Sequence, residues 1–355
     1  MSAKQWISIW FVSVIVLFVI GCINYMVDPY QQYRKTTFYN LPYEDERELN
    51  AGLAKNFEFD SVVMGTSMAE NFNLKDVQTI LGFTKAIKLT MAGSSAYEQN
   101  IILSTALRHQ NIKNVLWGLD FFSFYGDIHR LKHGEAFFPF YLYDENILND
   151  YKYLISSDTL RRSLKMVFGK KKDPSRYKYE TMYEWHSKTK KEDILDALYQ
   201  KWQNRKNFDN EARDYEKRFA YMKKNFEVNV FLLLENHPQI RFILFFPPYS
   251  VLAYKVYEER GELEEFLRFK RYVIQSVSEL SNVKVYDFQY ADDITHNLKN
   301  YYDLYHYNHK INRWILEQIA KDNYRVDFKN EKELSKKLLR EIKNYQVTQE
   351  LFEDR

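Results

Sequence analysis

Three residues in this sequence are of the types that form a nucleophilic triad. Ser67 closes the segment Gly-Thr-Ser, and Asp303 precedes His306 by three residues far along the chain. A serine hydroxyl is a poor nucleophile near neutral pH and needs a base within hydrogen-bonding distance. Histidine is suited to that task, and an aspartate can orient the imidazole ring. We predict Ser67 as the nucleophile, His306 as its base and Asp303 as the partner of the base.

Attack on an ester would also require donors for the oxyanion. The backbone amides of Ser67 and Gly93 are natural donors, since a glycine lets the substrate approach the backbone closely. We group Thr66 and Asp120 with Gly93 as candidate oxyanion or substrate-binding residues. An ionised Asp120 has no proton to donate, so it cannot act as an oxyanion donor.

Each motif also has an ordinary structural interpretation. A Gly-Thr-Ser sequence after a strand is most often a turn that caps a helix. An Asp-x-x-His pair is more often a surface ion pair or a helix cap than a catalytic dyad. The order of these motifs and their placement at strand ends in one fold favour a single shared site.

Other polar side chains receive structural assignments. We expect Glu70 to interact with a helix N-terminus as a charge partner. Tyr249 could line the cleft or pack in the core. The spacing of four further histidines matches no zinc site, so we expect neither a metal nor a cofactor; these are His129, His133, His296 and His309.

Short apolar runs that end in glycine, proline or small polar residues predict five buried strands. Amphipathic helices separate them, the clearest over Ala96 to His109, with an apolar stripe. This alternation predicts a parallel sheet with helices on both faces, whose ligands bind at the carboxyl ends of the strands. The strands are expected at residues 60–67, 86–89, 114–119, 240–246 and 283–287.

The N-terminal segment is the only long apolar run. The 23 residues from Gln5 to Val27 carry no charge, and about 20 apolar residues suffice to span a bilayer as a helix. A cleaved signal peptide is disfavoured because no small-x-small site follows. A lipidated Cys22 is disfavoured because the apolar run continues beyond it. A single spanning helix remains the preferred interpretation.

The remaining chain is expected to form one large soluble domain. An insertion rich in Lys, Tyr and Glu separates the third and fourth strands, and its basic run Gly169 to Lys172 is expected to be a loop tip. We divide the chain into a cytoplasmic tail (1–4), a transmembrane anchor (5–27), a linker with a first helix (28–58), an α/β domain (59–328) with a helical insertion (about 125–238), and a charged C-terminal helix (329–355).

Composition excludes several classes of protein. The net charge of the 355 residues is only +3, with both signs interspersed, which argues against nucleic-acid binding. The single cysteine excludes disulfide frameworks and cysteine-based zinc sites. The 29 Tyr and 26 Phe are consistent with a sugar-binding cleft but also with ordinary packing.

The motifs together resemble the SGNH/GDSL hydrolase superfamily. The matching blocks are Gly65-Thr66-Ser67, Gly93, Asp120 and Asp303-Leu304-Tyr305-His306. The anchor followed by Asn24 to Tyr30 is similar to the membrane-anchored bacterial branch of DltD-, AlgJ- and AlgX-like proteins. The resemblance covers the anchor and about 200 scattered domain residues.

The resemblance implies a three-layer, flavodoxin-like sheet and a serine esterase or O-acyltransferase whose domain lies outside the cytoplasmic membrane. Its substrate would be an envelope polysaccharide or a lipid-linked acyl carrier, with a membrane-bound acyltransferase as a further partner. The third block departs from the family pattern, because Asp120 stands where the superfamily usually has asparagine. A non-catalytic scaffold of a polysaccharide-modifying complex is therefore the alternative.

Overall fold

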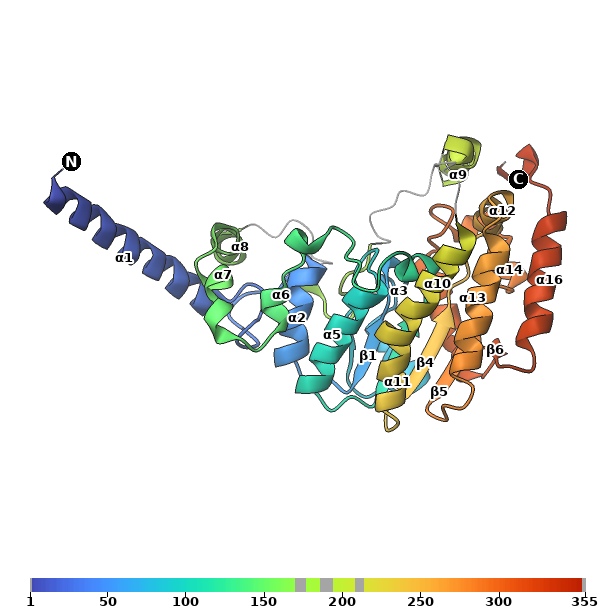
Figure 1. Ribbon diagram of the computed structural model, residues 1–355, viewed down its shortest axis with the longest axis horizontal. Coiled ribbons are helices and arrows are strands. Elements are labelled where there is room, and N and C mark those ends of the chain that lie inside the picture. Colours follow the sequence, from blue (N-terminus) through green and yellow to red (C-terminus); the bar gives the residue numbers. More distant parts are fainter. Residues whose placement is uncertain (1, 170–176, 186–193, 208–213, 353–355) are drawn as a thin grey trace.

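The structure is a computed structural model that describes residues 2–169, 177–185, 194–207 and 214–352. Lys170 to Lys172 of the expected basic loop tip lie outside the described residues. A long N-terminal helix projects from an α/β domain, and the C-terminus lies at the other end of the molecule (Figure 1).

The centre of the domain is a sheet of six strands in the order β2-β1-β3-β4-β5-β6. The first five strands are parallel, and their residues are mostly buried, as expected for a sheet covered on both faces. The five predicted strands are confirmed, and none of their ends differs from the prediction by more than three residues. The strands are β1 (Ser61–Met64), β2 (Ala86–Lys88), β3 (Asn114–Gly118), β4 (Arg241–Phe246), β5 (Val283–Asp287) and β6 (Arg325–Val326).

The expectation of a purely parallel sheet is wrong at one edge. Strand β6 pairs antiparallel with β5 through only two residue pairs, Val285 with Val326 and Tyr286 with Arg325. Because β6 has two residues, it offers no apolar run or alternation that a sequence pattern could detect. The sheet is therefore mixed, and mostly parallel.

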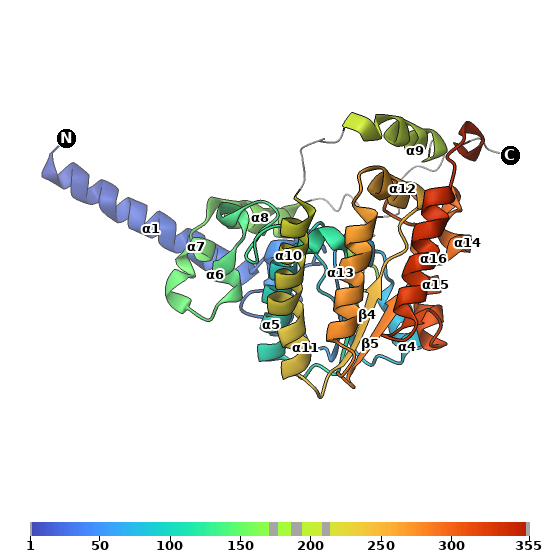
Figure 2. The same cartoon turned by 45° about the vertical axis from the view of Figure 1, so that its right-hand side comes forward.

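Helices cover both faces of the sheet. The chain passes from β1 to β2 in one direction and from β2 to β3 in the other, so right-handed crossovers put their helices on opposite faces. Helices α5, α10, α11 and α13 lie on the face toward the viewer in Figure 1, while α4 and α15 pack together behind it (Figures 1 and 2). These helices are α4 (Leu74–Leu81), α5 (Ala96–His109), α10 (Tyr215–Phe226), α11 (Leu232–Asn236), α13 (Leu263–Ser276) and α15 (His309–Ala320).

Further helices complete the domain. Between β3 and β4, the expected insertion contains several short helices and the crossover formed by α10, a π-helical turn (Glu227–Phe231) and α11. The charged C-terminal segment forms a helix that packs on α12 and α13. The remaining helices are α2 (Glu46–Asn56), α3 (Ser67–Glu70), α6 (Phe140–Tyr143), α7 (Tyr151–Leu154), α8 (Ser157–Phe168), α9 (Ile194–Gln203), α12 (Val251–Glu259), α14 (Asp292–Thr295) and α16 (Glu331–Asn344).

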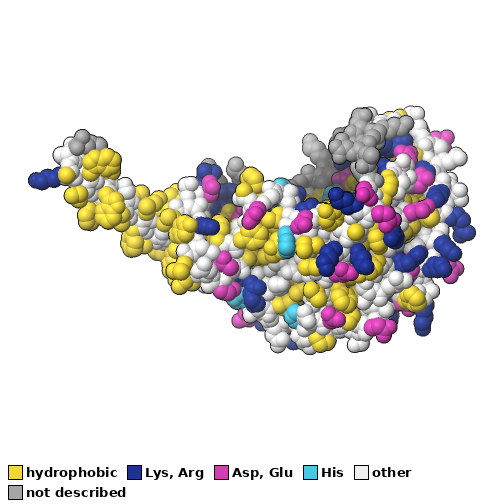
Figure 3. Space-filling view, viewed as in Figure 1, with side chains coloured by type: hydrophobic (Ala, Val, Ile, Leu, Met, Phe, Trp, Pro, Cys, Tyr) yellow, Lys and Arg dark blue, Asp and Glu magenta, His cyan; other side chains and the backbone are white. Residues whose placement is uncertain are grey.

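The apolar N-terminal run forms helix α1 (Ala3–Val27), which begins two residues before the expected anchor. The most apolar 18-residue window of α1 has a mean hydropathy of 2.6, and with 25 residues the helix is long and apolar enough to cross a membrane. Apolar side chains are exposed along its length (Figure 3). Near its C-terminal end, α1 packs on α7 and α8.

Candidate active site

The turn after β1 places Ser67 at the start of α3. Gly65 has φ +137°, and a Cβ there would lie 3.1 Å from the Cβ of Ala69 and 3.3 Å from the carbonyl oxygen of Gly118. Glycine is therefore needed at this position for conformation and for space. Thr66 caps the helix by accepting a hydrogen bond from the Met68 N–H. The turn thus brings the Ser67 hydroxyl to the carboxyl end of the sheet.

Ser67, His306 and Asp303 lie together, although 239 positions separate the serine from the histidine. The Oγ of Ser67 is 2.8 Å from Nε2 of His306, and Nδ1 of His306 is 2.8 Å from Oδ2 of Asp303. Both distances are those of good hydrogen bonds. A proton can therefore pass from the hydroxyl to the ring while the carboxylate fixes the ring orientation.

The surroundings of Asp303 keep its carboxyl group ionised. Burial alone would raise the pKa of Asp303, but the hydrogen bond and charge of His306 lower it overall, helped by the backbone N–H groups of Tyr305 and His306. Lys201 of α9 adds a positive charge 3.6 Å from Oδ2. Asp303 is therefore available as an acceptor for the Nδ1 proton of His306.

Two backbone amides on the wall of the cavity that Ser67 and His306 line are available as donors. Among the described residues, the N–H groups of Ser67 and Gly93 have no hydrogen-bond acceptor. Gly93 has φ +60°, a left-handed conformation in which a glycine carries no strain. Both residues line the same cavity as His306. This arrangement fits the predicted oxyanion donors.

Asp120 and Thr66 bond to each other rather than presenting free donors to the cavity. Oδ2 of Asp120 accepts a hydrogen bond from Thr66 Oγ1 at 2.5 Å, and Oδ1 accepts one from Tyr249 Oη at 2.6 Å. Burial raises the pKa of Asp120, although these two bonds and the charge of His306 act against the shift. Asp120 therefore connects the nucleophile turn to the end of β4. The Thr66 side chain is committed to this contact and to its cap.

Glu70 does not act as an exposed charge partner of the helix N-terminus, which corrects that expectation. Its side chain is buried, and burial together with the neighbouring Glu46 carboxylate raises its pKa well above the ordinary value. Glu46 accepts a hydrogen bond from the backbone N–H of Ala92 at 2.5 Å. The carboxyl pair therefore connects the Ser67 helix with the loop that carries Gly93.

The triad opens into a cavity of about 530 Å³ at the carboxyl ends of the strands. Tyr249 lines it while its own side chain is almost fully buried, so both expectations for this residue hold. Lys132 and Arg260 add positive charge to the wall. The further lining residues are mostly aromatic or small: Met68, Ala92, Phe122, Tyr125, Tyr257, Glu262 and Tyr305.

Trp185 is a neighbour of the triad that the sequence patterns did not identify. Its ring meets the His306 ring edge to face, with centroids 5.3 Å apart, and its indole N–H donates to the Ser67 carbonyl oxygen at 3.2 Å. Trp185 belongs to the insertion, far from every motif in the sequence. No spacing rule connects it with Ser67 or His306.

A second cluster of polar side chains lies away from this cavity. Ligand-type atoms of Asp292, His296 and Glu341 lie within 4.8 Å of one another, between α14 and α16. Lys337 donates to Asp292 at 2.9 Å, so a cation from the protein already faces the cluster. The cluster shares no residue with the cavity at Ser67.

Comparison of the chain with known protein families and with curated proteins gave no match.

Proposed function

We propose that the protein is a membrane-anchored SGNH-like serine esterase or O-acyltransferase. The observation that carries this proposal is the continuous hydrogen-bonded series from Ser67 through His306 to Asp303, with 2.8 Å at each step. The strand order β2-β1-β3-β4-β5 supports it, since this is the order of flavodoxin-like folds, which bind ligands at the strand ends.

The proposed reaction proceeds in two steps. Ser67 Oγ attacks the carbonyl carbon of an ester while its proton passes to His306 Nε2, and the Ser67 and Gly93 amides receive the oxyanion. The tetrahedral intermediate collapses, the alcohol leaves with the proton from His306, and an acyl-Ser67 remains. A water molecule or a sugar hydroxyl then gives its proton to His306 and takes the acyl group, which restores the Ser67 hydroxyl.

Envelope chemistry is the setting that we propose for this reaction. An apolar α1 would hold the domain on the outer side of the cytoplasmic membrane, with residues 1–4 inside. The cavity walls supply aromatic faces that can stack on pyranose rings or contact an acyl chain. An envelope polysaccharide or a lipid-linked acyl carrier is the substrate class that fits this combination.

Turnover of model esters tests the chemistry directly. We expect Ser67→Ala and His306→Ala each to lower kcat by roughly 10³-fold or more, and Asp303→Asn by on the order of 10²- to 10⁴-fold. Ser278→Ala, which changes an exposed serine distant from the cavity, is the matched control and should retain full activity. Equal activity in all four variants would remove the proposed mechanism.

The alternative is a non-catalytic scaffold, which the Asp120 contacts favour because that carboxyl group accepts two hydrogen bonds instead of donating to an oxyanion. Complementation of a deletion strain separates the two functions. Catalysis predicts loss of glycan acylation with Ser67→Ala and with His306→Ala at unchanged protein levels. Wild-type acylation in both strains would instead identify the scaffold.

A further inference from the structure

Helix α8 buries polar residues on one side and exposes an apolar stripe on the other, next to the exposed charges of Asp158, Arg161 and Lys165. On the buried side, Arg162 forms ion pairs with Glu44 and Asp45, and Ser163 donates to the Asn24 side chain at 2.9 Å. An amphipathic helix on a water-facing surface does the opposite and turns its apolar stripe toward the core. The orientation of α8 therefore requires an explanation other than packing in water.

The outward side of α8 carries large apolar residues at helical spacing. Leu164, Val167 and Phe168 are 44%, 45% and 79% exposed. Positions three and four apart share one helix face, so these side chains form one continuous surface. Ile155, in the turn before α8, adds to it with 40% exposure. We refer to these four residues as the α8 face.

Helix α8 lies beside the domain end of α1 (Figures 1 and 2). Asn24 is fully buried there, and its side-chain amide donates to the carbonyl oxygens of Leu154 and Ser156 at 2.7 and 3.2 Å. Ile155 is the neighbour of Gly21, where an added Cβ would lie 3.9 Å from Ile155 Cγ2. The contacts thus begin on the last two turns of the apolar helix, before its C-terminal end at Val27.

The position of these contacts on α1 determines how deep α7 and α8 would lie in a membrane that α1 spans. A helix of 25 residues is about 37 Å long, whereas the hydrocarbon core is about 30 Å thick. The last turns of α1, and the parts of the domain packed against them, therefore lie at the level of the lipid headgroups and the outer acyl chains. Water-facing side chains at that level are normally polar.

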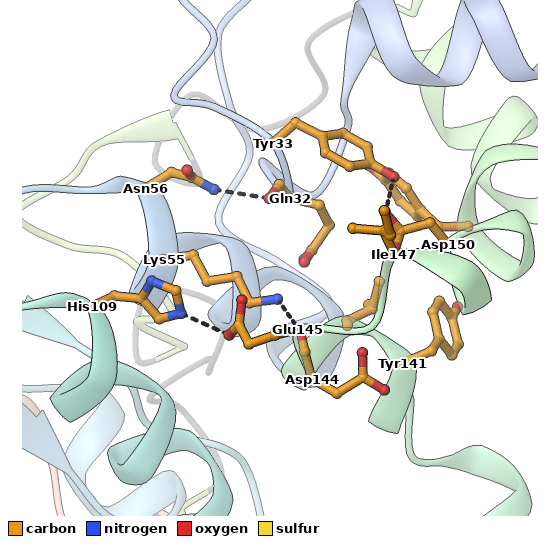
Figure 4. A pocket seen from close by; sticks show the side chains of 12 residues that line it. Gln32, Tyr33, Lys55, Asn56, His109, Tyr141, Asp144, Glu145, Ile147 and Asp150 are labelled. Carbon is orange, nitrogen blue, oxygen red and sulfur yellow. Dashed lines mark hydrogen bonds and ion pairs between the residues drawn. The ribbon is translucent and has the colours of Figure 1, made fainter.

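More apolar side chains are exposed in the segment that leads into α7. Ile147, Leu148 and Tyr151 are 80%, 82% and 56% exposed. Asp150, which lies between Leu148 and Tyr151, accepts a hydrogen bond from Tyr33 Oη at 3.0 Å, and this bond connects the segment with the chain that leaves α1 (Figure 4). We refer to Ile147, Leu148, Tyr151 and the α8 face together as the collar; the two helices in this part of the chain, α7 and α8, contact α1.

We propose that the collar binds the lipid bilayer at its interface, so that α7 and α8 hold the domain against the membrane in one orientation. The bilayer is the occupant because the collar continues the apolar surface of α1, which the domain leaves exposed (Figure 3). The inference rests on α1 spanning the membrane but not on the catalytic role of Ser67. It assigns α8 the function of an interfacial helix.

Collision measurements on spin labels test this contact. The full chain with Cys22→Ala is reconstituted in phosphatidylcholine nanodiscs, and single labels are placed by Leu164→Cys and Phe168→Cys. Val14→Cys, within α1, serves as the lipid reference, and Ser278→Cys serves as the aqueous reference. We expect the ratio of oxygen to nickel-chelate accessibility at both α8 positions to exceed that at Ser278 severalfold and to approach that at Val14.

The reference labels at Val14 and Ser278 show which part of the inference fails if the result differs from the expected one. A water-like ratio at Leu164 and Phe168, with a lipid-like ratio at Val14, would contradict lipid binding by the collar but would still support α1 as a membrane anchor. Water-like ratios at all positions would remove the anchor as well. Low accessibility to both reagents at the α8 positions would show a protein contact and would also contradict lipid binding. Because both side chains are exposed, the labels should not disturb folding; equal thermal unfolding of all variants checks this.

Discussion

The carboxyl pair of Glu46 and Glu70 is the most unusual electrostatic feature beside the nucleophile. Glu70 follows Ser67 by three residues, and Glu46 holds the Ala92 N–H next to Gly93. Burial and the neighbouring Glu46 carboxylate raise the pKa of Glu70, because a buried carboxylate next to another negative charge is costly to ionise. The neutral Glu70 carboxyl group is therefore expected to help fix the spacing between the Ser67 turn and the loop that carries Gly93.

The raised pKa of Glu70 gives stability a defined pH dependence. The folded state favours the neutral Glu70 carboxyl group. The contribution of this group to the free energy of unfolding is therefore fully present below pH 4.5, its ordinary pKa, and is lost as the pH rises through its higher pKa in the folded state. Glu70→Gln stays neutral at every pH. We expect its melting temperature to equal that of the wild type near pH 4 and to exceed it increasingly toward pH 8. A constant difference across this range would contradict the assignment.

Residue types, the order of strand ends and the Asp-x-x-His spacing were enough to predict that Ser67, His306 and Asp303 lie together, as they do in the structure. The Glu46–Glu70 pair could not be predicted in this way. Glu46 starts a helix in a segment with no distinctive motif, and only the fold brings it to Ala92. Glu70 was expected to be a helix-terminus charge because burial of a four-residue helix cannot be read from its sequence.

At the scale of elements, the insertion between β3 and β4 contributes Trp185 to the wall around the triad. Its indole N–H bond to the Ser67 carbonyl oxygen supports the turn that presents Oγ, and its ring packs against His306. Small misplacements of a catalytic group reduce turnover strongly. The insertion is therefore expected to position the site as well as to extend the domain.

Trp185→Phe tests this role, since phenylalanine retains a ring and lacks the N–H. We expect kcat to fall by roughly tenfold with little change in thermal stability, because Trp185 is only partly buried. Trp314→Phe is a matched control, since that ring packs on Phe288 and Tyr324 instead. Equal activity losses in the two variants would argue against a positioning effect at the triad.

Elements with a clear hydrophobic period were predictable and those without one were not. The helix over Ala96 to His109 has its expected bounds, since Ser95 and Glu98 form a capping box at its start. The parallel strands were visible as apolar runs. Strand β6 and the path of the insertion depend on tertiary contacts that leave no local signal.

At the scale of the whole molecule, an apolar helix is joined to a domain in which Ser67, His306 and Asp303 lie together at the carboxyl ends of the strands. The buried Asn24 and its three hydrogen bonds make the end of α1 part of the folded domain. Chain composition predicted a single anchor and one domain. It could not predict the inverted helix α8, because burial of a polar side depends on the partners that it meets.

The central claim is that Ser67 is an activated nucleophile, and a serine-reactive fluorophosphonate probe tests it most directly. We expect purified full-length protein to acquire one adduct, located at Ser67 by peptide mass spectrometry. The adduct should be absent in Ser67→Ala and after unfolding, and it should persist in Ser94→Ala, whose side chain bonds to Gln99 instead of His306. Unchanged labelling of Ser67→Ala, or no labelling of the folded wild type, would contradict the account.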